Sequence, residues 1–245
     1  MIDLRLGECL EVMKTIPDGS IDAIITDPPY GTTACKWDSV INFELMWEQL
    51  NRIIKPNGAI VLFGSEPFSS ALRMSNIKNY KNDWVWEKSI PTGGMAKYMP
   101  MKKHECVIIF YKNKCTFNPI MEERVNSHSK GNKKTYTKVS EHLSGTFNLY
   151  PSTKKRRPTS VLNIKSVPRH NSIHSTQKPI ELMEYLIKTY TNENETVLDF
   201  TMGSGTTMLA CKNLNRNGIG IEQDENYFDI ATDRISKEEK QLKIL

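Results

Sequence analysis

Two short apolar segments, far apart in the chain, end in the same way, and this shared ending constrains the fold more than any other feature. Residues 21–26 are mostly apolar, and they run directly into the tetrapeptide Asp27-Pro28-Pro29-Tyr30. Residues 196–198 run in the same way into Asp199 and a glycine-rich turn over residues 200–206. Short apolar runs that stop at Pro or Gly are typical of buried strands. We therefore predict two buried strands, each carrying a polar turn at its carboxyl end.

Strand and helix signals alternate through most of the rest of the chain. In the first half they predict strands at 2–6, 59–64, 84–87 and 106–111 and a helix at 43–54, which a Pro-Asn-Gly break ends. In the second half they predict strands at 196–199 and 219–222. They also predict three helices, which are at 179–190, between the glycine-rich turn and residue 214, and at 225–240. Such alternation indicates an α/β fold, with a mostly parallel sheet covered on both faces and a ligand site beyond the carboxyl ends of its strands.

The middle of the chain has a different composition. Residues 112–170 hold thirteen Lys or Arg against three Glu and no Asp, and the apolar periodicity fades there. We predict an inserted segment over 112–170, between one half of a domain at 1–111 and the other half at 171–245. Its basic cluster Lys154-Lys155-Arg156-Arg157 suits a phosphate backbone. The alternative is a solvated basic loop.

Bulk properties narrow the class of protein. The 245 residues carry a formal net charge of +5, and no apolar run is long enough to cross a bilayer. The first residues lack the pattern of a signal peptide, so a cytoplasmic protein is expected. The five cysteines are scattered without a CxxC pair, which argues against a disulfide framework or a zinc site. His170 and His174 have no supporting ligands nearby in the sequence, and we predict no metal.

The second turn favours a nucleoside ligand. Gly203 and Gly205 permit a sharp turn and a close approach of the backbone, while Ser204 and Thr206 offer hydroxyl groups. Glu222 ends the next predicted strand, nineteen residues after Gly203, where an acid accepts ribose hydroxyls in nucleoside-binding α/β proteins. The longer dinucleotide fingerprint is missing, which argues against a pyrophosphate-bearing cofactor. The alternative for the turn alone is an ordinary strand-to-helix connection.

The first turn suits an exocyclic amine. The carboxylate of Asp27 and the carbonyl of Pro28, stiffened by Pro29, can accept both hydrogens of an amine whose lone pair is delocalised into a ring. Tyr30 offers a flat face on which an extruded base can stack. The alternative is a loop with chance prolines.

Together, and in this order, the two turns resemble the beta class of S-adenosylmethionine-dependent DNA amino-methyltransferases, and the resemblance covers most of the chain. It implies a circularly permuted Rossmann-like methyltransferase fold with seven strands, one of them antiparallel. It also implies S-adenosyl-L-methionine as cofactor and double-stranded DNA as partner. The methyl group would pass directly, in line, to a flipped base, without a catalytic cysteine. Such an enzyme would be associated with the nucleoid and is often a homodimer. An Asp at position 27 accompanies adenine N6 chemistry in this family, whereas Ser accompanies cytosine N4 and Asn is commoner in enzymes acting on RNA.

The resemblance also assigns residues. Asp27, Pro28, Pro29 and Tyr30 become the catalytic motif, and Asp27, Asp199, Phe200 and the glycine-rich turn lie by the cofactor. Glu8 and Cys9 stand where the family has a Gly-Asp-Cys context that touches adenine, although here the acid is Glu. Gln177 and Lys178, just before the helix at 179–190, become contacts to the methionine portion, with a helix cap and an exposed lysine as the alternative. Three functions therefore stay open: an adenine N6 enzyme, a cytosine N4 or RNA enzyme, and an inactive partner subunit that binds nucleic acid.

Overall fold

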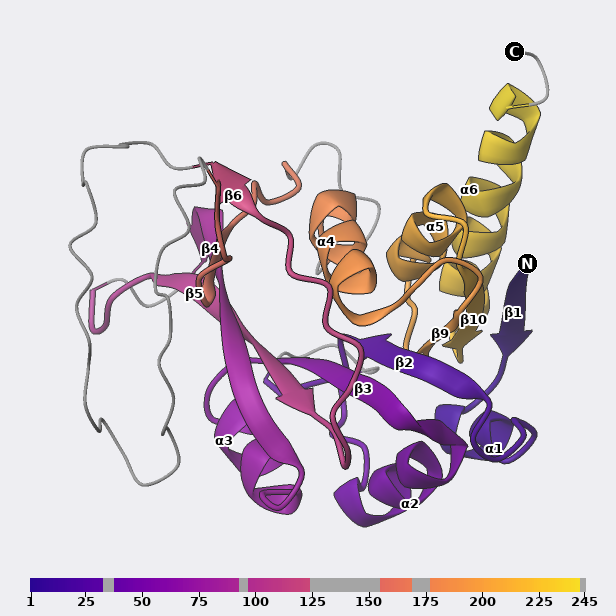
Figure 1. Ribbon diagram of the computed structural model, residues 1–245, viewed down its shortest axis with the longest axis horizontal. Coiled ribbons are helices and arrows are strands. Elements are labelled where there is room, and N and C mark those ends of the chain that lie inside the picture. The colour runs from indigo at the N-terminus through magenta and orange to yellow at the C-terminus, as the bar shows by residue number, and fades with distance from the viewer. Residues whose placement is uncertain (33–37, 93–96, 124–154, 169–176, 243–245) are drawn as a thin grey trace. The chain divides into compact units, whose positions relative to one another are not determined.

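The computed structural model describes residues 1–32, 38–92, 97–123, 155–168 and 177–242 (Figure 1). The chain divides into two compact units. One comprises residues 1–118 and 160–245, and the other comprises residues 119–159. His170, His174 and Lys154 lie outside the described residues.

The larger unit is built on one sheet of eight strands in the order β1-β10-β9-β2-β3-β5-β4-β8. The strands are β1 (Ile2–Leu6), β2 (Ile21–Thr26), β3 (Ile54–Gly64), β4 (Tyr80–Thr92), β5 (Lys102–Phe110), β8 (Val161–Asn163), β9 (Thr196–Asp199) and β10 (Asn217–Glu222). Only β5 runs against its neighbours β3 and β4, while every other pairing in this sheet is parallel. The predicted α/β class and the single antiparallel strand are confirmed.

The two ends of the chain meet inside the sheet. β1 pairs in parallel with β10, so that Ile2 lies opposite Gly218 and Leu6 opposite Glu222. The first strand thus sits beside the last, as a circularly permuted order requires. The sheet has one strand more than the seven expected, because β8 adds to the edge strand β4. Residues 161–163, expected to belong to the insertion, therefore complete the sheet of the larger unit.

Helices cover both faces of this sheet (Figure 1). The helices are α1 (Cys9–Met13), α2 (Phe43–Ile53), α3 (Phe68–Ser75), α4 (Ile180–Tyr190), α5 (Thr206–Asn213) and α6 (Glu225–Leu242). Side chains of β3 alternate between two buried clusters: Val61 and Phe63 pack with α4 and α5, whereas Ile60 and Leu62 pack with α1, α2 and α3. Since strand side chains alternate between faces, a strand covered on both sides is apolar throughout.

Some local predictions were wrong in detail. Helices α1 and α3 were not predicted, because each is short. The Pro-Asn-Gly segment, read as a break before the strand, lies within β3. The structure absorbs it through a register shift against β2 between Ile21 and Ala23. Trp84 and Trp86 are core residues, as expected, and their indole N–H groups donate to Tyr190 Oη and the carbonyl of Ile164.

The smaller unit contains a two-stranded antiparallel sheet of β6 (Glu122–Glu123) and β7 (Lys155–Arg156). Arg156 forms an ion pair of 2.8 Å with Glu122 across these strands. Lys155, Arg156 and Arg157 are all exposed. Among the described residues, no helix is long and apolar enough to cross a membrane.

Candidate active site

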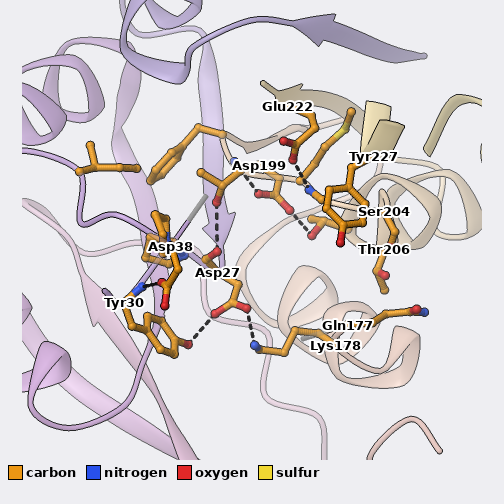
Figure 2. Close-up of a pocket in the computed structure, with 18 of the residues that line it drawn as sticks. Asp27, Tyr30, Asp38, Gln177, Lys178, Asp199, Ser204, Thr206, Glu222 and Tyr227 are labelled. Atoms are coloured by element: carbon orange, nitrogen blue, oxygen red, sulfur yellow. Dashed lines mark hydrogen bonds and ion pairs between the residues drawn. The ribbon is translucent and has the colours of Figure 1, made fainter. Parts of the chain in front are cut away.

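One cavity of about 800 Å³ lies at the carboxyl ends of β2, β9 and β10 in the larger unit (Figure 2). Both turns open into it. Its lining includes the whole tetrapeptide from Asp27 to Tyr30 together with Asp199, Gly203 and Glu222. The two motifs, separated by most of the sequence, therefore share one pocket. Parallel strands bring this about because their carboxyl ends meet at one edge of the sheet.

The side chains of Asp27 and Tyr30 are joined directly. Tyr30 Oη donates a hydrogen bond of 2.5 Å to Asp27 Oδ1, and Lys178 Nζ forms an ion pair with Asp27 Oδ2. The Tyr30 ring stacks on Phe68 at 5.0 Å between ring centroids. Burial raises the pKa of Asp27, and the ammonium of Lys178 opposes that rise. Carboxylate and ring are thus held in a fixed relation at the pocket wall.

Asp38 holds the backbone that follows the tetrapeptide. Its carboxylate accepts the backbone N–H groups of Tyr30, Gly31 and Thr32 at 2.7, 2.8 and 2.9 Å. Gly31 takes a positive φ of 68°, which lets the chain curl around the acid. Sequence reasoning missed Asp38, because a single acid in a polar segment carries no distinctive signal.

Glu105 and Lys88, which sequence reasoning did not single out, continue the network of ion pairs that begins with Asp27 and Lys178. Glu105 of β5 pairs with Lys178 at 3.2 Å and with Lys88 of β4 at 3.1 Å. Burial opposes the charge on Lys178, but Asp27 and Glu105 raise its pKa to about 12. Burial also opposes the charge on Glu105, yet Lys178 and Lys88 hold its pKa below the usual range. Both strands carry other charged residues as well, so no pattern in the sequence distinguished this pair.

Asp199 is buried and fully engaged by its own protein. Oδ1 accepts from Thr26 Oγ1 at 3.0 Å and from the Thr201 backbone at 3.2 Å, while Oδ2 accepts from Thr207 Oγ1 at 2.5 Å. Burial raises its pKa to about 7, although these hydrogen bonds oppose the rise. Phe200, which follows, is almost completely buried in the core. Asp199 thereby fixes the start of the glycine-rich turn.

Glu222 faces the pocket from the end of β10. Its carboxylate accepts three backbone N–H groups, from Gly203, Gln223 and Asp224, each at 2.9 Å. Burial raises its pKa, and the same N–H groups oppose that shift. Gly203 has a positive φ of 52° and lines the cavity. The glycine-rich turn and the acid on the next strand are therefore joined by a hydrogen bond.

The remaining residues of the glycine-rich turn differ in what they face. Ser204 and Thr206 line the cavity, and Arg234 of α6 donates to the Ser204 carbonyl and to Thr206 Oγ1. Gly205, which lies between them, does not line the cavity. Instead Gly205 has a φ of 77° at the start of α5, and a Cβ there would come within 2.9 Å of Ala231. Its small size serves helix packing.

Glu8 and Cys9 line another part of the cavity wall. Glu8 caps α1 by accepting the backbone N–H of Glu11 at 2.9 Å. Burial, reinforced by Glu8, raises the pKa of Cys9 to about 12, so this thiol is a poor nucleophile. Cys9, Cys106, Cys115 and Cys211 are all free.

Gln177 and Lys178 come just before α4, and both line the cavity (Figure 2). Lys178 is buried, and its ammonium lies against Asp27 and Glu105. The expected alternative of an exposed lysine is therefore wrong. Tyr227 of α6 also lines the cavity near Ser204, a contact that sequence reasoning missed. Within the described residues, no cluster of His, Cys, Asp and Glu could hold a metal ion.

Comparison with known proteins adds independent findings. A family model described as DNA methylase, of the N6/N4 type, matches residues 21–233. The chain is 30% identical to the Type II methyltransferase M.HpaI of Haemophilus parainfluenzae, over 97% of this chain and 76% of the relative. It is also 30% identical to the Type II methyltransferase M.HinfI of Haemophilus influenzae, over 94% of this chain and 67% of the relative. The crystal structure of the M1.HpyAVI–SAM complex matches with a TM-score of 0.65 and 30% identity, covering 96% of this chain and 99% of that one.

Proposed function

This chain belongs to the DNA methylase family, and from that premise we propose that it transfers a methyl group from S-adenosylmethionine to N6 of adenine in double-stranded DNA. One observation carries the proposal: Asp27 and Glu222 line the same cavity. Asp27, which suits an amine, and Glu222, which suits a ribose, can therefore contact the target base and the cofactor in the same cavity.

The pocket residues fit S-adenosylmethionine. A cavity of about 800 Å³ is within the usual size of a small-molecule site, roughly 300–1,000 Å³. Backbone N–H groups fix the Glu222 carboxylate while it still lines the cavity, so its remaining lone pairs can accept hydroxyl groups. We assign Glu222, Gly203, Ser204, Glu8 and Gln177 to holding this molecule. When bound, it supplies an electrophilic methyl group on a positively charged sulfur.

Asp27 activates the amine in this proposal. Its carboxylate and the Pro28 carbonyl accept the two amine hydrogens, which draws the nitrogen towards tetrahedral geometry and exposes its lone pair. The backbone carbonyl of Asp27 is itself held, because Thr201 Oγ1 donates to it at 3.1 Å. A fixed carboxylate costs less reorganisation when the amine reacts.

Tyr30 has two roles in the proposal. Its hydroxyl orients the Asp27 carboxylate, and its ring offers a stacking face for a base that has left the duplex. Phe68 packs against the ring and so limits its rotation. An extruded base would therefore meet a surface that is already in place.

Adenine is favoured over cytosine by the acid at position 27, on the family resemblance. The test incubates the purified full chain and tritiated S-adenosylmethionine with duplex DNA and, in a parallel reaction, with RNA, then digests the nucleic acid and separates the nucleosides. We expect N6-methyladenine. Label in N4-methylcytosine would select the cytosine alternative, label only in RNA substrates would select an RNA enzyme, and no transfer to any nucleic acid would favour the inactive partner subunit.

Sequence reading is assigned to residues 112–170, with Lys154, Lys155, Arg156 and Arg157 contacting phosphates. Long-read sequencing of DNA from cells expressing the protein would reveal the modified sequence. Homodimer formation and association with the nucleoid stay predictions, which sedimentation of the pure protein and imaging in cells would test.

A further inference from the structure

A chain of buried, alternating charges leads away from Asp27 into the sheet. It runs from Asp27 to Lys178, from Lys178 to Glu105 and from Glu105 to Lys88. The side chains of Lys178 and Lys88 are only 9% and 7% exposed, and that of Glu105 is 15% exposed. Buried ions are costly unless they are well paired. The amine-activating role of Asp27 requires none of the charges behind it, so their presence needs a separate reason.

Lys178 occupies the place that a substrate amine needs. Tyr30 donates to Asp27 Oδ1, and Lys178 holds Asp27 Oδ2. An amine that donates a hydrogen to this carboxylate therefore competes with the Lys178 ammonium for Oδ2. Since an ammonium makes stronger hydrogen bonds to a carboxylate than a neutral amine does, the competition disfavours the substrate unless the ammonium gains another partner.

Glu105 offers that partner. Its Oε2 is buried and forms an ion pair of 3.2 Å with Lys178 Nζ, without a well-aligned hydrogen bond in the part of the chain that the structure describes. Its other oxygen is held by Lys88. The carboxylate is thus anchored by Lys88 on one side, and its other oxygen already lies beside the Lys178 ammonium and can hold it more closely.

We propose that Glu105 is a positioning residue that takes the Lys178 ammonium from Asp27 when the substrate amine engages, so that Oδ2 becomes free to accept an amine hydrogen. The inference rests on the proposed function and deepens it. The ammonium moves between two carboxylates as an intact ion, and no proton is transferred. The pKa of Lys178, raised to about 12 against the effect of burial, keeps the ion charged at either position.

The first test replaces Glu105 by Gln, which keeps the shape and removes the charge that attracts the ammonium. We expect kcat for methyl transfer to duplex DNA to fall by about tenfold or more, with the Kd of S-adenosylmethionine changed by less than about twofold. The matched control is Glu87→Gln. Glu87 pairs with Lys103 at 2.8 Å on the neighbouring strand, but both side chains are substantially exposed, and we expect no change.

A double-mutant cycle with Lys178→Met separates positioning from a merely structural role. If Glu105 acts through Lys178, then adding Glu105→Gln to Lys178→Met lowers kcat by less than about twofold further. If Glu105 only supports the fold, the same tenfold loss appears in both backgrounds, and the proposal is overturned. If Glu105→Gln does not fold, Glu105→Asp takes its place in the cycle. It keeps the charge but shortens the reach, so we expect it to lower kcat several-fold when Lys178 is present and by less than about twofold in Lys178→Met.

Failure of this inference differs from failure of the proposed function. A wild-type protein that transfers no methyl group to DNA defeats the proposed function. An active wild type with a fully active, folded Glu105→Gln variant defeats only the role of Glu105.

Discussion

Thr201 donates its side-chain hydroxyl to the backbone carbonyl of Asp27 at 3.1 Å, across 174 positions of the sequence. Thr201 belongs to the glycine-rich turn and Asp27 to the proline-rich one. A second link lies beside it, because Thr26 Oγ1 accepts the backbone N–H of Phe200 at 3.1 Å and donates to Asp199. The two halves of the site are thus connected by hydrogen bonds and not merely adjacent.

Thr201→Val is predicted to lower kcat several-fold and the free energy of unfolding by about 1 kcal/mol, because it removes one hydrogen bond while keeping the side-chain shape. Thr201→Ser keeps the hydroxyl and is expected to behave like wild type. Thr232→Val is the matched control, since Thr232 also donates to a backbone carbonyl, but from the exposed side of α6. Equal losses in Thr201→Val and Thr232→Val would contradict a specific role for the link.

Asp27→Ala is predicted to abolish measurable methyl transfer while the Kd of S-adenosylmethionine changes by less than about tenfold, because the change removes the acceptor for the amine but leaves Glu222 and Gly203 in place. Calorimetry measures binding and the tritium assay measures transfer. Asp18→Asn, at an exposed ion pair with Arg52, controls for loss of an acid elsewhere. Full activity in Asp27→Ala would defeat the assignment.

Glu222→Gln is predicted to weaken binding of S-adenosylmethionine by about tenfold or more, since a neutral amide is a poorer acceptor for ribose hydroxyls and also turns an N–H₂ group towards backbone donors. At saturating cofactor, kcat is expected to stay within a few-fold of wild type. Glu195→Gln is the control, because Glu195 also accepts a backbone N–H, from Asn192 at 2.7 Å, but does not line the cavity. An unchanged Kd for Glu222→Gln would remove Glu222 from the binding site.

Asp199→Asn is predicted to change how stability depends on pH. Burial raises the pKa of Asp199 to about 7 in the folded protein, above the ~3.9 of an unfolded chain. Between these values the folded state keeps a proton that the unfolded state has lost, so the free energy of unfolding falls as pH rises, by at most about 1.4 kcal/mol per pH unit. Urea unfolding across this range should show that contribution in wild type and not in Asp199→Asn. Parallel curves for the two proteins would show that Asp199 titrates normally.

Arg157→Gln is predicted to weaken DNA binding about equally for all sequences and to reduce the salt dependence of log K by about 0.9 for each phosphate that the variant no longer neutralises. Fluorescence anisotropy over a series of salt concentrations measures both effects. Lys237→Gln removes an equally exposed positive charge from α6 and is expected to leave the slope unchanged. An unaltered slope in Arg157→Gln would favour a solvated loop over phosphate binding by this residue.

The local pattern of residues was enough for much of the fold and for one half of the site. Short, mostly apolar segments marked β2, β9 and β10, because a strand covered on both faces is largely apolar. The pairing of Gly203 with Glu222 was also accessible, since both lie in a single strand-turn-helix-strand unit whose spacing is set by local geometry. The Pro-Asn-Gly segment was wrongly predicted to be a break before the strand, because β3 continues through it with a register shift against β2.

The sequence by itself therefore determined the α/β class and the two turns that carry acids, since each depends on residues close together in the chain. The permuted order came from the resemblance to the family. Only the tertiary structure decided that Lys178 pairs with Asp27 and Glu105, that Asp38 holds the loop after Tyr30, and that Thr201 joins the two turns. The physical reason is that most of these contacts join residues on separate strands and helices. Their distance is fixed by the crossovers of the sheet and by burial, which no local spacing encodes.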